Sequence, residues 1–282
     1  MTNEMQSRDE TDLVQRAQKG DQAAFEALIT EHRNPLFSYI YRMVTHRQNA
    51  EDLLQDVLVR VMQSLPQYRR EAKFKTWLFG IATHACLDHL RKKNRWGVDA
   101  QLKGEHETDD DPEAMAGLRS MMAEPDFVFE IREHIAFCFS CISRTLSPEE
   151  QAAIMLKEVL GFTAQEGAQI MESSEPIFRH NLSSARSTMI QHYDGLCALI
   201  NKTGICHQCE GLREVAGEEH SGPSLVQIQV GPKLAVTPEN LFDSRLKIVS
   251  EAKFPFEKAS PMHDLFYQML TAREEQTTGE HL

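Results

Sequence analysis

Apolar residues in the first third of the chain recur at steps of three and four positions, which is the spacing of amphipathic α-helices. The pattern covers residues 12–44, where Asp21 suits a helix start. It returns over Asn49–Leu65, where Asn49 is the candidate N-cap. The buried stripe of this second helix is predicted to comprise Leu53, Leu54, Val57, Leu58, Val61 and Leu65.

The opposite face of the Asn49–Leu65 helix is polar and carries Asp52, Gln55, Asp56 and Arg60. A polar helix face is most often simply solvated. It can also dock on a partner protein, and the residues alone leave both alternatives open.

The segment that follows, Gln67–Lys75, combines aromatic rings with positive charge. The aromatic residues here and just beyond are Tyr68, Phe74 and Trp77, and the cations are Arg69, Arg70, Lys73 and Lys75. Cations neutralise phosphates, and aromatic faces stack on unpaired bases. The segment therefore predicts a single-strand nucleic-acid site; the alternative is a turn with core aromatics and incidental charge.

A further helix is expected to begin at Thr76, which can cap it, and to end in a cluster of cations. The cluster consists of Arg91, Lys92, Lys93 and Arg95. Cations match the negative end of a helix dipole. Four within five residues exceed what that match needs.

Residues 146–193 predict a second helical unit. Ser147 with Glu150, and Thr163 with Glu166, have the spacing of helix starts, and Gly161 suits a helix end. A third helix should begin at Ser173 or Ser174. Short helix, tight turn and longer helix make a helix-turn-helix, although a plain helical hairpin has the same pattern.

The longer helix of this unit is expected to have a core face and an outward face. The predicted core residues are Ile177, Leu182, Ala185 and Met189. The predicted outward residues are Arg179, His180, Ser183 and Arg186.

Net charge is −12, which alone argues against nucleic-acid binding. The acidity is concentrated, however, because residues 99–130 carry ten acidic residues against two basic ones, whereas residues 1–98 carry fifteen basic against twelve acidic. We expect an all-α fold with domains at 1–98 and 127–198, a flexible linker at 99–126 and an extension at 199–282. Within the extension, Ser224–Val230 and Arg245–Val249 resemble short strands, and His263–Ala272 a helix.

The N-terminus lacks an apolar signal core and no run of about 18 apolar residues occurs, so a cytoplasmic protein without a membrane span is expected. Six cysteines then indicate free thiols or a metal. Cys138, Cys141, Cys206 and Cys209 could form a structural zinc site, with His134 or Cys197 as alternates. Core packing of the first pair and a thiol switch are the other interpretations.

The sequences AEDLLQDVLVRVMQSLPQYR and FKTWLFGIATHACLDHLRKK resemble region 2 of bacterial RNA polymerase sigma factors of the extracytoplasmic-function (ECF) class in the sigma-70 family. Residues 146–193 resemble region 4 more loosely. The resemblance implies a promoter-specificity subunit, not an enzyme, that binds core polymerase and promoter DNA. It implies the β′ clamp helices and the β flap as docking sites, and an anti-sigma factor as a further partner.

The resemblance also implies roles for particular residues. Asp52, Gln55, Asp56 and Arg60 would dock on the clamp helices, while the loop Gln67–Phe74, with Trp77, would take a flipped base of the −10 element. Arg91, Lys92 and Lys93 would contact the DNA backbone. The helix Glu175–Ser187, with Glu175, Arg179, His180, Ser183 and Arg186, would lie in the major groove at the −35 element.

Two departures from the family pattern concern the helix-turn-helix. Gly167 stands where the family usually has Ile, and the last helix has Asn181, Ser183 and Ser184 where Arg and Lys are common. Region 4 is therefore expected to bind phosphate weakly. The alternative function is a helix-turn-helix regulator that acts without polymerase and senses a metal or oxidant through its cysteines; a Cys/His metalloenzyme is a third.

Overall fold

The computed structural model describes residues 2–93, 95–97, 112–122, 131–197, 237–252, 263–264 and 266–267. All regular structure in these residues is helical, which confirms the all-α prediction. None of the helices in this part of the chain is long and apolar enough to cross a membrane. In chain order the helices are α1 (Thr2–Gln18), α2 (Gln22–Val44), α3 (Arg47–Ser64), η1 (Leu65–Gln67), α4 (Phe74–Arg91), α6 (Pro112–Met122), α7 (Ile131–Ser143), α8 (Pro148–Ile154), η2 (Met155–Val159), α9 (Ala164–Ile170), α10 (Glu175–Leu196) and α13 (Pro238–Glu251).

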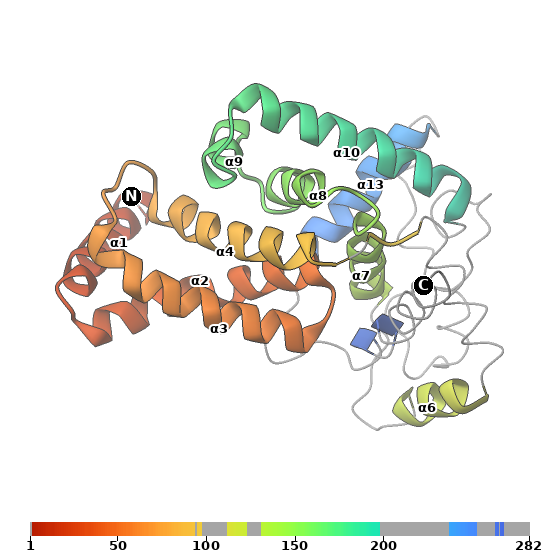
Figure 1. Ribbon diagram of the computed structural model, residues 1–282, viewed down its shortest axis with the longest axis horizontal. Coiled ribbons are helices and arrows are strands. Elements are labelled where there is room, and N and C mark those ends of the chain that lie inside the picture. Colours follow the sequence, from red (N-terminus) through yellow and green to blue (C-terminus); the bar gives the residue numbers. More distant parts are fainter. Residues whose placement is uncertain are drawn as a thin grey trace.

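The N-terminal helices α1 to α4 pack on one another as a bundle (Figure 1). The side chain of Asp21 accepts a hydrogen bond from the backbone N–H of Ala24 and so caps α2, as predicted. The N-cap of helix α3 lies three residues earlier than predicted, at His46 rather than Asn49. Helix α4 likewise begins at Phe74, so Thr76 lies inside the helix and is buried.

The second unit comprises α7 to α10, and its helix starts follow the predicted caps. Ser147 with Glu150 and Thr163 with Glu166 both form complete capping boxes. Ser174 caps α10. Gly161, at φ +73°, turns the chain after the η2 segment, because a residue without Cβ adopts this conformation without strain.

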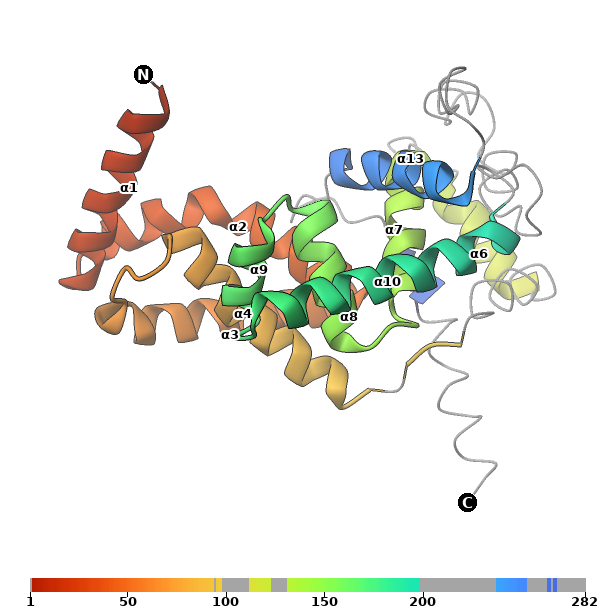
Figure 2. The same cartoon turned by 90° about the horizontal axis from the view of Figure 1, so that it is seen from above.

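The two units pack directly against each other. Helices α8 and α9 lie along α4 (Figures 1 and 2). Gln151 of α8, which is 1% exposed, donates a hydrogen bond of 3.0 Å to the carbonyl oxygen of Met43 in α2. The buried apolar residues of both units belong to one continuous cluster, which also includes residues of α13.

One prediction for the rest of the chain was wrong in the residues that the structure describes. Arg245–Val249 belongs to helix α13, which Thr237 caps with Pro238 in the first turn. Its alternating pattern suggested a strand, but Leu241, Phe242 and Leu246 are spaced for a helix and are buried. Part of the expected flexible linker is helix α6, whereas the other predicted strand, Ser224–Val230, lies outside the described residues.

Candidate polymerase and nucleic-acid interface

The outward face of α3 is exposed and mixes charge with apolar surface. Asp52, Gln55, Asp56 and Arg60 are all exposed, as predicted. Val59 and Met62, which occur on the same helix, are 48% and 50% exposed. They are two of the three large apolar side chains that stand exposed among the described residues.

Val59 and Met62 are the residues that sequence reasoning missed on this face. Val59 lies three positions after Asp56, and Met62 lies three positions after Val59, so a helical projection of the apolar residues outside the buried stripe would have found both. Apolar surface within a charged face is typical of a protein-binding surface, because a merely solvated face gains nothing from it.

The loop between α3 and α4 is closed by its own hydrogen bonds. The hydroxyl of Tyr68 donates to the carbonyl oxygen of Ala72 at 2.6 Å. Gln18 of α1 donates from its side-chain amide to the carbonyl oxygens of Leu65 and Tyr68. Arg70 adopts a left-handed backbone conformation with φ 62°, which is unusual for a non-glycine residue. Arg69 and Arg70 both remain exposed.

The three aromatic residues of this region form a cluster of their own. The ring centroids of Tyr68 and Trp77 are 4.8 Å apart, and that of Phe74 lies 5.7 Å from Trp77. Phe74 is only 2% exposed and Tyr68 9% exposed, so both belong to the core of the bundle in this conformation. Trp77 is half-buried, and its ring is the most accessible platform of the three.

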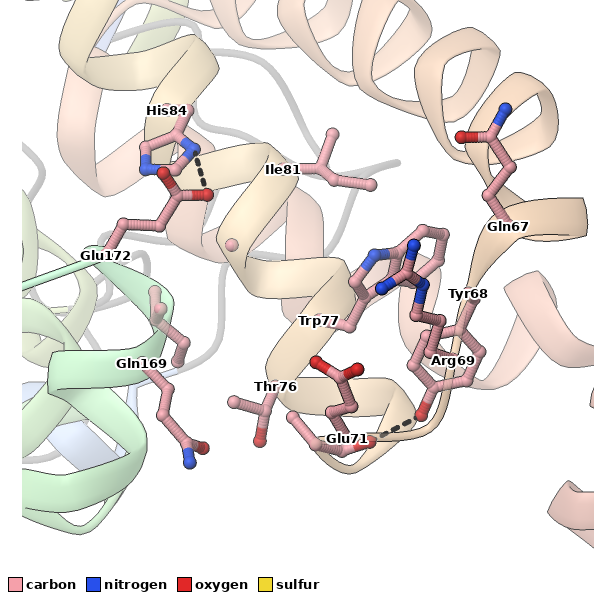
Figure 3. A pocket seen from close by; sticks show the side chains of 13 residues that line it. Gln67, Tyr68, Arg69, Glu71, Thr76, Trp77, Ile81, His84, Gln169 and Glu172 are labelled. Atoms are coloured by element: carbon pink, nitrogen blue, oxygen red, sulfur yellow. Dashed lines mark hydrogen bonds and ion pairs between the residues drawn. The ribbon is translucent and has the colours of Figure 1, made fainter.

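A pocket of about 440 Å³ lies between this loop, α4 and the end of α9. Figure 3 shows Tyr68, Arg69 and Trp77 on one side of it, and His84, Gln169 and Glu172 on the other. A volume of this size is in the range of small-ligand sites. With an indole and a guanidinium on its wall, the pocket offers stacking and phosphate contact to a nucleotide.

Two cations predicted to bind DNA, Lys73 and Arg91, are paired with carboxylates of the second unit. Lys73 donates to Glu166 of α9 at 2.9 Å, and Arg91 donates to Glu149 of α8 at 2.8 Å. His84 of α4 lies 3.8 Å from Glu172. The backbone N–H of Thr163, followed by the Lys73 ammonium, lowers the pKa of Glu166 to about 2. Lys92 and Lys93 are exposed beyond the end of α4.

Helix α10 exposes most, but not all, of the predicted recognition residues. Arg179, His180 and Ser183 are exposed, and Arg179 pairs with Glu175 one turn earlier. Arg186 is different: its guanidinium is half-buried and pairs with Glu158 at 3.0 Å and Asp243 of α13 at 2.7 Å. The outward orientation predicted for Arg186 was therefore wrong, because acidic groups from η2 and α13 flank it.

The core face of α10 also differs from the prediction, at the start of the helix. Ile177 is 54% exposed, whereas Phe178 is fully buried, so the prediction of a core Ile177 was wrong. Phe178 lies over Gly167 of α9, where an added Cβ would stand 2.3 Å from the ring. Gly167 thus makes room for Phe178, and the ring fixes the turn of the helix-turn-helix. Ala185 and Met189 are buried as predicted, and Leu182 packs partly buried against the core.

The predicted zinc site cannot be assembled from the described residues. Cys206 and Cys209 lie outside them, and in the described part of the chain no group of three or more His, Cys, Asp or Glu side chains could hold a metal. Cys138 is half-buried, and Cys141 and Cys197 are buried. His134 packs among Phe137, His263 and Phe266.

Comparisons with known proteins agree with this arrangement. Residues 28–96 match the family model of sigma-70 region 2. The chain is 25% identical over 179 residues to the RNA polymerase sigma-H factor of Pseudomonas aeruginosa, covering 63% of this chain and 90% of that protein. It is 26% identical over 181 residues to the ECF RNA polymerase sigma-E factor of Escherichia coli, with the same coverage of 63% and 90%.

A third relative is the ECF RNA polymerase sigma factor SigW of Bacillus subtilis, with 32% identity over 92 residues, 32% of this chain and 49% of the relative. Among solved structures, that of CnrH in complex with the cytosolic domain of CnrY aligns with a TM-score of 0.44 and 19% identity, covering 66% of this chain and 97% of that one.

Residues 28–96, which include most of α2 and all of α3 and α4, give the chain its similarity to sigma-70 factors. Within that family the chain resembles sigma factors of the ECF class.

Proposed function

We propose that this chain binds core RNA polymerase and directs promoter-specific transcription initiation in the cytoplasm. In this proposal the exposed face of α3 docks on the β′ clamp helices and the α3–α4 loop holds an unpaired base of the −10 element. Helix α10 enters the major groove at the −35 element, while the second unit also meets the β flap. An anti-sigma factor is a further proposed partner. The observation that carries the proposal is the exposure of Val59 and Met62 among the charged residues of α3, directly before a basic loop with a pocket.

The geometry supports a division of labour between α3 and the loop. Asp56 and Arg60 project from one face of α3, whereas Arg69 and Arg70 lie beyond its end, in the loop that borders the pocket. Protein docking and strand capture would thus use separate, adjoining surfaces. Trp77 supplies the stacking platform in this proposal, because Phe74 is buried and its ring is not accessible to a base.

On α10, the exposed residues suit base contact better than strong phosphate binding. Ile177 offers an apolar contact for a thymine methyl group, and His180 and Ser183 offer hydrogen bonds to base edges. Few free cations remain on this helix, so most of the affinity for the DNA backbone is proposed to come from Arg69, Arg70 and the end of α4.

The docking proposal is tested by Asp56→Lys, which reverses one charge on an exposed surface. We expect affinity for core polymerase to fall about tenfold, which corresponds to about 1.4 kcal/mol. Glu26→Lys is the matched control, since it makes the same charge change on an exposed position of α2. If both variants bind core as the unaltered chain does, α3 is not the docking face.

The alternative function, a helix-turn-helix regulator that works without polymerase, makes a different prediction. Such a protein would bind duplex DNA alone and would never co-purify with core polymerase. The exposed apolar residues of α3 favour the sigma-factor proposal, because the regulator gives them no role. A metal or redox role for the cysteines is compatible with either function, and metal analysis of protein purified without chelators tests it.

A further inference from the structure

Helix α13 is joined to the N-terminal bundle through a buried arginine. Arg42 of α2 is 2% exposed and donates hydrogen bonds to the carbonyl oxygens of Val249 at 3.0 Å and Ala252 at 2.6 Å. These two carbonyls stand at the C-terminal end of α13. A cation is favourable there because unpaired carbonyls and the helix dipole make that end negative.

Helix α13 also contacts the second unit, through aromatic packing, a cation–π contact and an ion pair. The ring of Phe242 lies 6.2 Å from that of Phe139 in α7 and 6.1 Å from that of Tyr193 in α10. The guanidinium of Arg245 stacks on Tyr193 at 3.5 Å. Asp243 pairs with Arg186 of α10. Figures 1 and 2 show α13 lying beside α7 and α10.

A later piece of the chain, residues 263–264 and 266–267, makes a second bridge of the same kind. Asp264 accepts a hydrogen bond from the backbone N–H of Arg47 at the start of α3. Tyr267 packs on His46, with ring centroids 4.6 Å apart. From the same piece, His263 stacks at 4.2 Å on Phe137 of α7, which belongs to the other unit.

The closed packing that these bridges hold together has an electrostatic consequence. Three cations that are predicted to contact DNA are paired with carboxylates. Lys73 pairs with Glu166, and Arg91 pairs with Glu149. Arg186 pairs with both Glu158 and Asp243. A carboxylate on each cation takes the place that a DNA phosphate would need. By contrast, the face of α3 around Asp56 stays exposed.

We propose that α13 and residues 263–264 and 266–267 form an intramolecular clamp that holds the two units closed and keeps the DNA-binding cations neutralised. DNA binding would require the clamp to release, while the docking face on α3 remains available throughout. The inference rests on the proposed function for the identity of the DNA-binding residues. It assigns a regulatory role to the C-terminal extension, with the rest of this chain as its binding partner.

The test uses Asp243→Asn in the full chain, since Asp243 is exposed and its loss should leave the fold intact. Binding of a fluorescein-labelled 30-base-pair duplex of random sequence is measured by anisotropy over a range of salt concentrations. We expect the variant to bind several-fold more tightly than the unaltered chain. The plot of log K against log salt should also steepen by about one unit for each released phosphate contact.

Glu239→Gln is the matched control, because it removes the same charge from the same helix at a position with no ion pair in the described structure. Equal gains in both variants would assign the effect to net charge and overturn the clamp. So would unchanged DNA affinity in Asp243→Asn, or no DNA binding by any variant.

Phe242→Ala loosens the clamp without altering charge. We expect amide hydrogen exchange to accelerate in α13 and at the α4–α9 contact, while α1–α3 stay protected, together with a gain in DNA affinity. Faster exchange in α13 with unchanged DNA affinity would contradict the inference. If this variant loses protection throughout, Asp243→Asn decides the question alone.

The outcome is separable from the proposed function. If the clamp variants bind DNA more tightly but the chain never binds core polymerase, the clamp proposal is supported and the sigma-factor function is contradicted. If the unaltered chain directs initiation but the clamp variants have no effect, the sigma-factor function is supported and the clamp proposal is contradicted.

Discussion

Replacement of Gly167 by alanine should destabilise the helix-turn-helix, although alanine is the better helix former. An added Cβ would lie 2.3 Å from Cζ and 2.4 Å from Cε2 of Phe178, where ordinary contacts begin at 3.4 Å. Phe178 is fully buried, so its ring has no solvent into which it can move.

The net magnitude follows from two opposing effects. Alanine in place of glycine inside a helix gains about 1 kcal/mol. Overpacking a well-packed core costs roughly 1–3 kcal/mol, and an overlap of this depth belongs in the upper half of that range. We therefore expect Gly167→Ala to lower the free energy of unfolding of the second unit by about 1–2 kcal/mol.

The assay is urea unfolding followed by circular dichroism, with hydrogen exchange of α9 and α10 to localise the change. Gly195→Ala in α10 is the matched control, because nothing lies within 4 Å of its added Cβ. It should be neutral or stabilising by up to about 1 kcal/mol.

A second-site change tests the cause directly. In a double-mutant cycle, Phe178→Leu should remove the overlap, giving a favourable coupling of about 1 kcal/mol or more with Gly167→Ala. The proposed overlap between residue 167 and Phe178 would be refuted if Gly167→Ala stabilised the chain as Gly195→Ala does. Additive effects of Gly167→Ala and Phe178→Leu would also refute it.

Three further predictions concern the loop and the closed packing. Trp77→Ala should weaken binding of a short single-stranded DNA by about 1–3 kcal/mol in a fluorescence titration, the value of one stacked base, and an unchanged affinity would remove the stacking role. Arg69→Ala with Arg70→Ala should impair open-complex formation, followed by permanganate reactivity, more than core binding; equal losses would contradict separate surfaces. The depressed pKa of Glu166 implies stability that is present above the ordinary value of 4.5 and is lost as pH falls toward about 2. Glu166→Gln should abolish that part of the acid transition in hydrogen exchange of α9, and an unaltered transition would show that Glu166 does not cause it.

The helix starts of the second unit were predictable because they depend on local chemistry. Ser147 and Thr163 cap their helices with the Glu three residues later, and such a box needs no tertiary contact. Gly161 ends its helical segment for an equally local reason. The family resemblance then supplied the order of the units.

The predictions that were wrong concerned residues whose contacts lie elsewhere in the sequence. Ile177 and Phe178 are adjacent apolar residues, and only the space above Gly167 decides which of them is buried. Arg186 faces acidic groups from η2 and from α13, which lies more than fifty residues later. Helix propensity and periodicity carry no information about such contacts.

The candidate site was predictable in its residue types and less so in its geometry. The polar residues of α3 are exposed as expected, but the exposure of Val59 and Met62 was not predicted, because the periodicity of the buried stripe concerns only the residues that belong to it. In the loop, the three aromatic residues suggested two stacking platforms for unpaired bases. Because the bundle is small, it uses two of these rings, Tyr68 and Phe74, to complete its own core.

The most direct test of the central claim is transcription in vitro with core RNA polymerase, sheared genomic DNA of the source organism as template, and mapping of RNA 5′ ends. The full chain and Asp243→Asn are compared with core polymerase alone. We predict start sites that appear only when the chain is present, share a common upstream sequence, and are used more strongly by Asp243→Asn. An absence of chain-dependent start sites with both proteins would contradict the assignment of this chain as an initiation factor.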